Sequence, residues 1–200
     1  MKLGNYTVQI QGGLERDNGY VEMTHNTKYT ILLSNDSELN SDAVVEIDGK
    51  QVGIWRVSSG KSIQIERPVH DTGHFTFYKL DSSESRKIGL VRNDKLGLIS
   101  VLFKPEKPII PVDFDLMFDD ENVDFDGDVE EFDLSMFDEP DSYSAGGTGL
   151  SGKSEQKFID VKALDYNEAA FVQIHLRLIC KEEQPRPLTP ISTQIPPPLC

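Results

Sequence analysis

The fold of this 200-residue chain is decided by residues 43–57, AVVEIDGKQVGIWRV. Ala43, Val45 and Ile47 alternate with other residues at the period of two that is typical of a half-buried strand. Asp48-Gly49 follows, and this dipeptide is a strong signal for a two-residue hairpin because both central positions must tolerate positive φ. Apolar residues then return up to Val57. The stretch therefore predicts two antiparallel strands joined by a tight turn.

Similar alternation recurs along the rest of the chain. It appears around residues 6–10, 29–33, 63–65, 75–77 and 99–103, and the most apolar run comes last, at 171–179. No segment keeps a period of 3.6, and residues 81–94 have room for one helical turn at most. Many short strands with turns every ten residues or so are typical of a sandwich. We therefore predict an all-β chain that folds as a single antiparallel β-sandwich of about eight or nine strands.

The net charge of −14 comes from one segment. Residues 113–141 contain fourteen acids and no Lys or Arg, and subtracting them leaves 20 acids against 20 bases. A strand or hairpin after residue 156 cannot bury its own apolar face, so it must complete the sandwich begun by residues 1–104. The acidic segment is then an insertion. The expected organisation is a sandwich from 1–111 plus 150–180, an acidic, aromatic-containing insertion at 112–149 and a Pro-rich extended tail at 181–200.

The acidic insertion contains an imperfect repeat. Residues 114–121, FDLMFDDE, recur at 132–139 as FDLSMFDE, so an extended chain here would have one apolar edge and one anionic edge. Two interpretations remain open, an acidic loop in solution and a docking strand that orders on a sheet edge of its own or a neighbouring subunit. The candidate assembly contacts are Phe114, Leu116, Phe118, Phe125, Phe132, Leu134 and Phe137.

Residues 124–131, DFDGDVEE, resemble a calcium-binding loop because hard cations prefer several carboxylate oxygens close together. The glycine stands at the fourth position instead of the sixth, which does not fit an EF-hand. Calcium is the one cofactor that the sequence suggests, and it does so weakly. The candidate ligands are Asp124, Asp126, Asp128 and Glu130.

The glycine-rich run at residues 146–152 calls for a separate interpretation. Residues 147–154 fit the string of a phosphate-binding loop, but that motif should follow a buried strand and open a helix. Here an acidic stretch precedes it and a strand is expected after it. We therefore interpret the glycines as a sharp backbone turn at which the chain re-enters the sandwich.

Several classes of function are disfavoured by composition. A net charge of −14 argues against nucleic acid, which requires a basic stripe. The sequence has no run of about 18 apolar residues, which is the length that a membrane-spanning helix needs. No nucleophile elbow or comparable arrangement is present, so we do not expect an enzyme. Two glycosylation acceptors, Asn5 and Asn35, would place the protein at a cell or particle surface or outside the cell if they are used.

Two groups of motifs carry a resemblance to known proteins. The first group comprises residues 47–56, 65–68 and 75–77, and the second comprises residues 146–152 and 156–158. Together they resemble β-rich proteins predicted from microbial, protist and large-virus genomes, some of which are related to subunits of extracellular filaments. The resemblance covers both halves of the sandwich but neither the acidic repeat nor the tail. It implies a fold and an assembly role, and it carries no active-site residues.

These observations lead to two hypotheses. The first is a structural subunit that assembles with copies of itself into an extracellular filament by donating extended segments to neighbours. The donor candidates are residues 112–140, the N-terminal strand at 5–11 and the tail. The alternative is a monomeric sandwich that decorates a surface or binds a basic partner through its acidic, aromatic-containing loop. The two differ in their response to salt, because charge pairing weakens as ionic strength rises.

Overall fold

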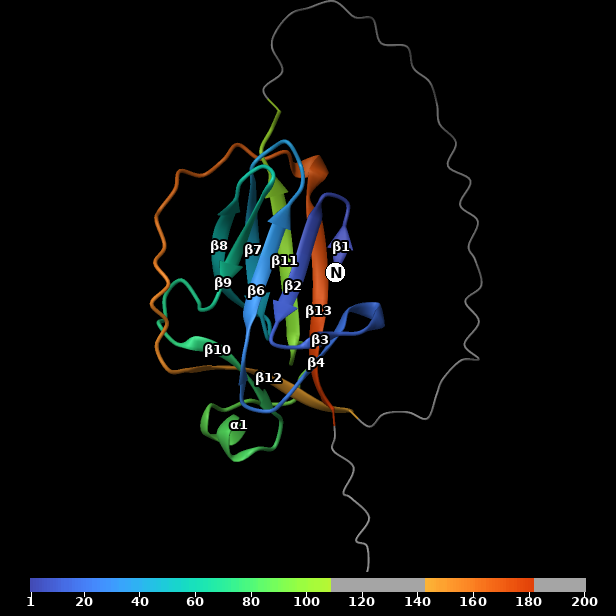
Figure 1. Cartoon of the computed structure of the whole chain (residues 1–200), viewed down its shortest axis with the longest axis vertical. Helices are drawn as coiled ribbons and strands as arrows, with labels where there is room; N and C mark the ends of the chain where they lie inside the picture. Colours follow the sequence, from blue (N-terminus) through green and yellow to red (C-terminus); the bar gives the residue numbers. More distant parts are fainter. Residues whose placement is uncertain (109–142, 182–200) are drawn as a thin grey trace, which may run out of the picture.

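The computed structural model describes residues 1–108 and 143–181. These residues form an all-β fold in which two sheets pack face to face as a sandwich (Figure 1). Within them there is one short α-helix, α1 (Ser83–Lys87), in the stretch where the sequence allows one helical turn. There are also two single turns of 3-10 helix in the described residues. The turn η1 (Asp17–Gly19) precedes strand β4 (Tyr20–Met23), and η2 (Glu168–Ala170) precedes strand β13 (Val172–Lys181).

The smaller sheet has four antiparallel strands in the order β1–β2–β6–β9. The N-terminal strand β2 lies between β1 and β6 in this sheet. It pairs with β6 from Tyr6 to Gln11 and with β1 at Tyr6 and Thr7. Donation of residues 5–11 to a neighbour would require these pairs to break, and it stays a prediction that the proposal below does not use. The strands are β1 (Lys2–Leu3), β2 (Tyr6–Gln11), β6 (Thr30–Asn35) and β9 (Lys61–Ile65).

The larger sheet has nine strands, seven of them along the path β5–β10–β12–β13–β11–β7–β8. Strand β4 pairs with β13 in parallel, which departs from the purely antiparallel expectation, and β3 pairs with β4. The last strand, β13, is the most apolar run of the sequence and lies at the centre of the sheet. The bounds are β3 (Leu14–Glu15), β4 (Tyr20–Met23), β5 (Thr27–Lys28), β7 (Ser41–Ile47), β8 (Lys50–Val57), β10 (His74–Lys79), β11 (Leu98–Pro105), β12 (Tyr143–Ser151) and β13 (Val172–Lys181).

The predicted hairpin is confirmed as β7 and β8. Asp48 and Gly49 have φ values of 52° and 77°, the left-handed conformation that a two-residue turn of this kind needs. The Asp48 carboxylate also accepts hydrogen bonds from the backbone N–H of Gly97 at 2.6 Å and of Thr148 at 2.8 Å. Burial raises the pKa of Asp48 above its ordinary value, although both hydrogen bonds oppose that shift. The turn thus connects two distant parts of the chain.

The core lies between the two sheets and consists of the inward residues of each strand. Aromatic rings bridge the layers: Tyr6 of β2 stacks on Phe103 of β11 with ring centroids 4.4 Å apart. Tyr29 stacks on Phe75 at 5.6 Å, and its hydroxyl lies 2.7 Å from that of Thr148. The largest fully buried side chains are Phe75, Phe77, Phe103, Ile31, Leu33, Ile65, Ile99, Leu176, Leu178, Val8, Val21 and Val45.

The glycine-rich run is part of a strand, so its interpretation as a sharp turn is wrong. Residues 143–151 form β12, and the sandwich therefore resumes before the expected boundary at 150. Three of these glycines leave room for neighbouring side chains. A Cβ on Gly146 would lie 2.2 Å from the Phe77 ring, one on Gly147 would lie 2.6 Å from Leu96, and one on Gly149 would lie 2.5 Å from Ile88. Close packing over β12 explains the composition of this run.

Candidate functional site

One side of the sandwich is open at the edges of both sheets. Strand β8 ends the larger sheet and β9 ends the smaller one, and within the described residues each has a single strand partner. A three-residue turn joins them, so their free edges face the same side. Residues 152–167, here named the covering segment, run along this side between β12 and β13 without forming a strand ladder (Figure 1, orange). The candidate site lies beneath it.

The covering segment is attached at its N-terminal end by Gln156. The side-chain amide of Gln156 donates to the carbonyl of Gln64 at 2.6 Å and accepts from the N–H of Glu66 at 3.0 Å. These are the groups that a paired strand would satisfy at the end of β9. Nearby, the N–H of Ser154 donates to the carbonyl of Thr72 at 2.7 Å. One side chain thus replaces a stretch of strand pairing at this edge.

Arg67 reinforces the same attachment. Its Nε and Nη2 donate to the carbonyl of Gln156 at 3.1 and 2.7 Å, while Nη1 donates to the carbonyl of Asp71 at 2.9 Å. The guanidinium also lies over the ring of Phe158, 4.2 Å from its centroid. On the other side, Phe158 meets Trp55 edge to face at 5.8 Å. Phe158 is therefore held between a cation and an indole.

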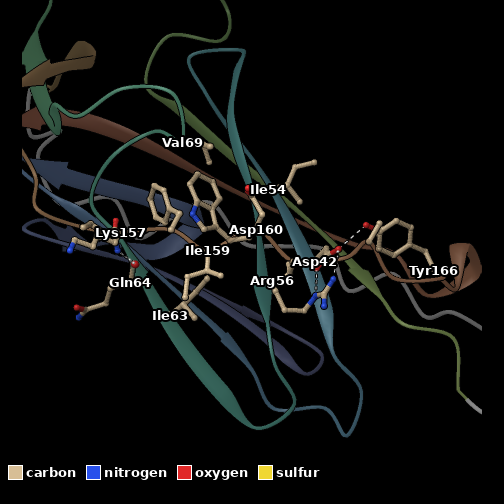
Figure 2. A pocket seen from close by; sticks show the side chains of 15 residues that line it. Asp42, Ile54, Arg56, Ile63, Gln64, Val69, Lys157, Ile159, Asp160 and Tyr166 are labelled. Atoms are coloured by element: carbon tan, nitrogen blue, oxygen red, sulfur yellow. Dashed lines mark hydrogen bonds and ion pairs between the residues drawn. The ribbon is translucent and has the colours of Figure 1, made fainter.

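The C-terminal end is attached through Asp42, which is buried on β7. Arg56 Nη2 donates to one Asp42 oxygen at 3.2 Å, Arg56 Nε donates to the other, and the Tyr166 hydroxyl donates to Asp42 Oδ2 at 2.7 Å. Figure 2 shows Arg56 and Tyr166 converging on Asp42 from two sides. Arg56 Nη2 also donates to the carbonyl of Lys162 at 2.8 Å. The hydrogen bond that Arg56 donates to Asp42 raises the pKa of the guanidinium.

Tyr166 is held in its neutral form by these surroundings. Partial burial raises the pKa of its hydroxyl first, and the hydrogen bond and negative charge of Asp42 raise it further. The Arg56 charge opposes the shift. The backbone around Tyr166 is also attached, since Asn167 N–H donates to the carbonyl of Pro105 at 2.9 Å. Both ends of the covering segment are therefore anchored by hydrogen bonds.

Between the two anchored ends, residues 157–161 make no hydrogen bond to any described residue. Two apolar side chains of this stretch are exposed, since Ile159 is 89% and Val161 57% accessible to solvent, whereas Phe158 is half-buried. Ile54, which projects outward from β8, is 50% accessible. Three branched aliphatic side chains thus face water around one opening, which is an unusual concentration for a small domain.

The opening leads into a groove of about 560 Å³ between the covering segment and the edges of β8 and β9 (Figure 2). Trp55 forms part of its wall. The indole is buried, and its Nε1–H has no hydrogen-bond acceptor among the described residues. The residues that line the groove are Asp42, Ile54, Trp55, Arg56, Ile63, Gln64, Val69, Gln156, Lys157, Phe158, Ile159, Asp160, Val161, Ala163 and Tyr166.

The chemistry of the groove suits binding. Asp42, Arg56 and Tyr166 satisfy one another, and Gln156 and Arg67 are occupied by the backbone, so these polar side chains hold the covering segment in place. The walls are aromatic and aliphatic. The polar groups that remain for a ligand are the exposed side chains of Lys157 and Asp160, which form no ion pair with a described residue, and the Trp55 N–H, which is buried. Such a site would bind an extended segment with apolar side chains and hydrogen-bond acceptors.

The structure places only a few of the residues singled out from the sequence. The seven candidate assembly contacts, Phe114 to Phe137, and the calcium candidates Asp124, Asp126, Asp128 and Glu130 lie outside the described residues, and both stay predictions. Within the described ranges, no three His, Cys, Asp or Glu side chains are grouped as metal ligands. No helix there has the length and apolar character needed to cross a membrane.

The two glycosylation acceptors have different surroundings. Asn5 is exposed on the turn before β2. Asn35 is buried, and its side-chain nitrogen donates to the carbonyls of Leu39 at 2.8 Å and Val57 at 3.0 Å. A glycan would replace one of the two amide hydrogens that these bonds require. The folded domain therefore presents Asn5 for modification and does not present Asn35.

Sequence reasoning missed the groove. Gln156, Arg67 and Asp42 act there only because the two sheet edges meet, and their spacing in the sequence gives no such signal. A weak signal was available in residues 158–161, FIDV, where apolar residues occur in a segment that forms neither strand nor helix. Unexplained apolar side chains in an irregular connection indicate either burial or an interface.

Comparisons with known proteins give no information on the function of this chain. No family model matches the chain, and neither the curated proteins nor the solved structures contain a significant match. The resemblance to filament-related proteins therefore stays a prediction.

Proposed function

We propose that this chain is a structural subunit that assembles with copies of itself by receiving a donated extended segment on the open side of the sandwich. The observation that carries the proposal is the groove, where Ile54, Ile159 and Val161 are exposed near a buried Trp55 N–H that has no acceptor among the described residues. Two sheet edges end at this groove, and edge strands are the sites where extended segments add. The remaining donor candidates are residues 112–140 and the tail.

The geometry of donation favours an open assembly. A donor on one copy and an acceptor on the next are different surfaces, so the contact is heterologous and repeats unless the rotation closes a ring. A filament is the expected product, in keeping with the resemblance noted in the sequence. The alternative, a monomeric binding module, would use the same groove for a foreign segment.

The test is the oligomeric state of Ile159→Asp. A carboxylate at this 89% exposed position should leave folding unchanged and weaken self-association at least about tenfold, because it would have to be desolvated in the contact. Light scattering across a concentration series and negative-stain microscopy would measure this. Val91→Asp is the matched control, since Val91 is 69% exposed in the loop between α1 and β11.

Two results would contradict the proposal. One is wild-type protein that stays monomeric at every concentration, which would favour the binding module. The other is equal weakening by Val91→Asp, which would show that the groove has no special part in assembly.

A further inference from the structure

The groove offers three features that together select one kind of ligand. Its walls include the aromatic side chains of Trp55, Phe158 and Tyr166. The Trp55 Nε1–H lacks an acceptor among the described residues, and such a buried donor carries a free-energy cost until an acceptor reaches it. The rim carries the Asp160 carboxylate and the Lys157 ammonium, and neither forms an ion pair in the described part of the chain.

A polyproline II segment with a basic residue fits these features. It makes no internal hydrogen bonds, so its carbonyls are free to accept from an indole N–H. Its rings pack on aromatic walls, and it is already extended, which lowers the entropy lost on binding. A guanidinium beside it would pair with a carboxylate at the rim.

This chain contains such a segment in its tail. Residues 185–190 read PRPLTP, and Arg186 is the only base after Lys181. Pro187 and Pro190 are three residues apart, and a polyproline II helix has three residues per turn, so they would lie along one edge. The tail thus combines the proline spacing and the single positive charge that the groove favours.

The sheet register shows that this segment cannot reach the groove of its own copy. Trp55 pairs with Ala43, Ala43 with Phe103 and Phe103 with Val172, so the groove is level with the start of β13. The tail begins after Lys181, which lies nine residues further along β13. Strand β13 is three strand spacings away from β8 in the sheet. The combined separation is about 33 Å from strand geometry. Pro185 is four residues past Lys181, a reach of about 14 Å at full extension.

We propose that the groove binds residues 185–190 of a second copy. Arg186 pairs with Asp160, a backbone carbonyl of the segment accepts from Trp55 Nε1–H, and the prolines pack on the aromatic walls. Residues 159–161 give way to admit the segment, since they make no hydrogen bond to the described residues, while Phe158 stays between Arg67 and Trp55 and both flanks stay anchored. The inference rests on the proposed function, because it names the segment that one subunit donates to the next.

Charge reversal across the proposed contact tests it on the full-length chain. Asp160→Arg and Arg186→Asp should each weaken self-association about five- to tenfold, and the chain with both changes should recover wild-type association within about threefold. Sedimentation velocity would measure the dissociation constants. Glu155→Arg is the control for Asp160→Arg, since Glu155 is exposed on the same covering segment outside the groove and should leave association unchanged.

Mixing tests whether the contact forms between two copies. The Asp160→Arg chain keeps an intact tail and the Arg186→Asp chain keeps an intact groove, so a mixture should associate more strongly than either chain alone. Trp55 is the only tryptophan, and its emission should change with concentration as the N–H gains an acceptor. Trp55→Phe should remove that change and weaken association in light scattering.

Each outcome has a distinct meaning. Wild-type association that is unaffected by both reversals would overturn the inference and leave the proposed function standing. Wild-type protein that never associates would overturn the proposed function as well. An emission change that depends on Arg186 but is independent of concentration would show that the tail occupies its own groove, and the assignment to a second copy would be wrong.

Discussion

The interior of the sandwich and its open side are built from similar apolar residues but are completed differently. In the interior, Phe103 stacks on Tyr6 and is fully buried by strands of the same chain. On the open side, Phe158 is held by Trp55 and Arg67 at the margin of a groove, and Ile159 beside it faces water. In the interior, the apolar side chains are already buried by residues of the same chain. The open side retains exposed apolar surface and an indole N–H without an acceptor among the described residues, which is why we propose binding there.

The largest expected effect is in the interior. Phe103→Ala should lower the free energy of unfolding by about 3–5 kcal/mol, because it removes a fully buried ring and leaves a cavity. Phe158→Ala, the same change on the open side, should cost about 1–2 kcal/mol because that ring is only half-buried. Urea unfolding followed by circular dichroism would measure both. Equal losses would show that the open side is as tightly packed as the core.

The next prediction tests how tightly side chains pack over the glycines of β12. Gly146→Ala should lower the free energy of unfolding by about 1–3 kcal/mol, since the new Cβ would lie 2.2 Å from the Phe77 ring. Gly60→Ala is the comparator, because its Cβ would meet nothing within 4 Å and only its φ of 64° opposes the change, at about 1 kcal/mol. A smaller loss for Gly146→Ala than for Gly60→Ala would contradict the close packing described over β12.

The anchor at the C-terminal end of the covering segment should respond to pH. Tyr166→Phe should cost about 1 kcal/mol below pH 10, because Asp42 loses one donor. Since the pKa of Tyr166 is raised in the folded protein, its contribution is complete below the ordinary value and is lost as pH rises through the higher folded value.

The free energy of unfolding of the wild-type and Tyr166→Phe proteins would be measured from pH 8 up to the highest pH at which both still fold. The wild-type advantage over Tyr166→Phe should shrink only at the alkaline end. An advantage that is already lost near neutral pH would show that the Tyr166 hydroxyl does not stabilise this anchor.

The smallest effect on stability is expected at the groove rim. Ile159→Ser together with Val161→Ser should change the free energy of unfolding by no more than about 0.5 kcal/mol, because both side chains already face water. Self-association measured on the same samples should nevertheless fall. A large loss of stability with unchanged association would mean that these residues serve the fold.

Local patterns predicted the parts of the fold that depend on neighbouring residues. Alternation at 43–47 and the Asp48-Gly49 turn predicted the β7–β8 hairpin, because period and positive φ are local requirements. The same reasoning misread the glycines of β12 as a turn. Their small size serves side chains from β10 and the α1 region, which are far away in the sequence. Packing of that kind leaves no local periodicity to detect.

The sequence by itself determined an all-β sandwich, the position of one tight hairpin and the concentration of acidic residues at 113–141, since each follows from composition or from the spacing of a few residues. Only the tertiary structure decided where the groove that we propose as a binding surface lies. Trp55 lies on β8, whereas Asp160 and Tyr166 lie on the covering segment, and they meet because β8 and β9 are edge strands on the same side and the covering segment crosses there. Sheet order is set by long-range pairing, and no short stretch of sequence specifies it.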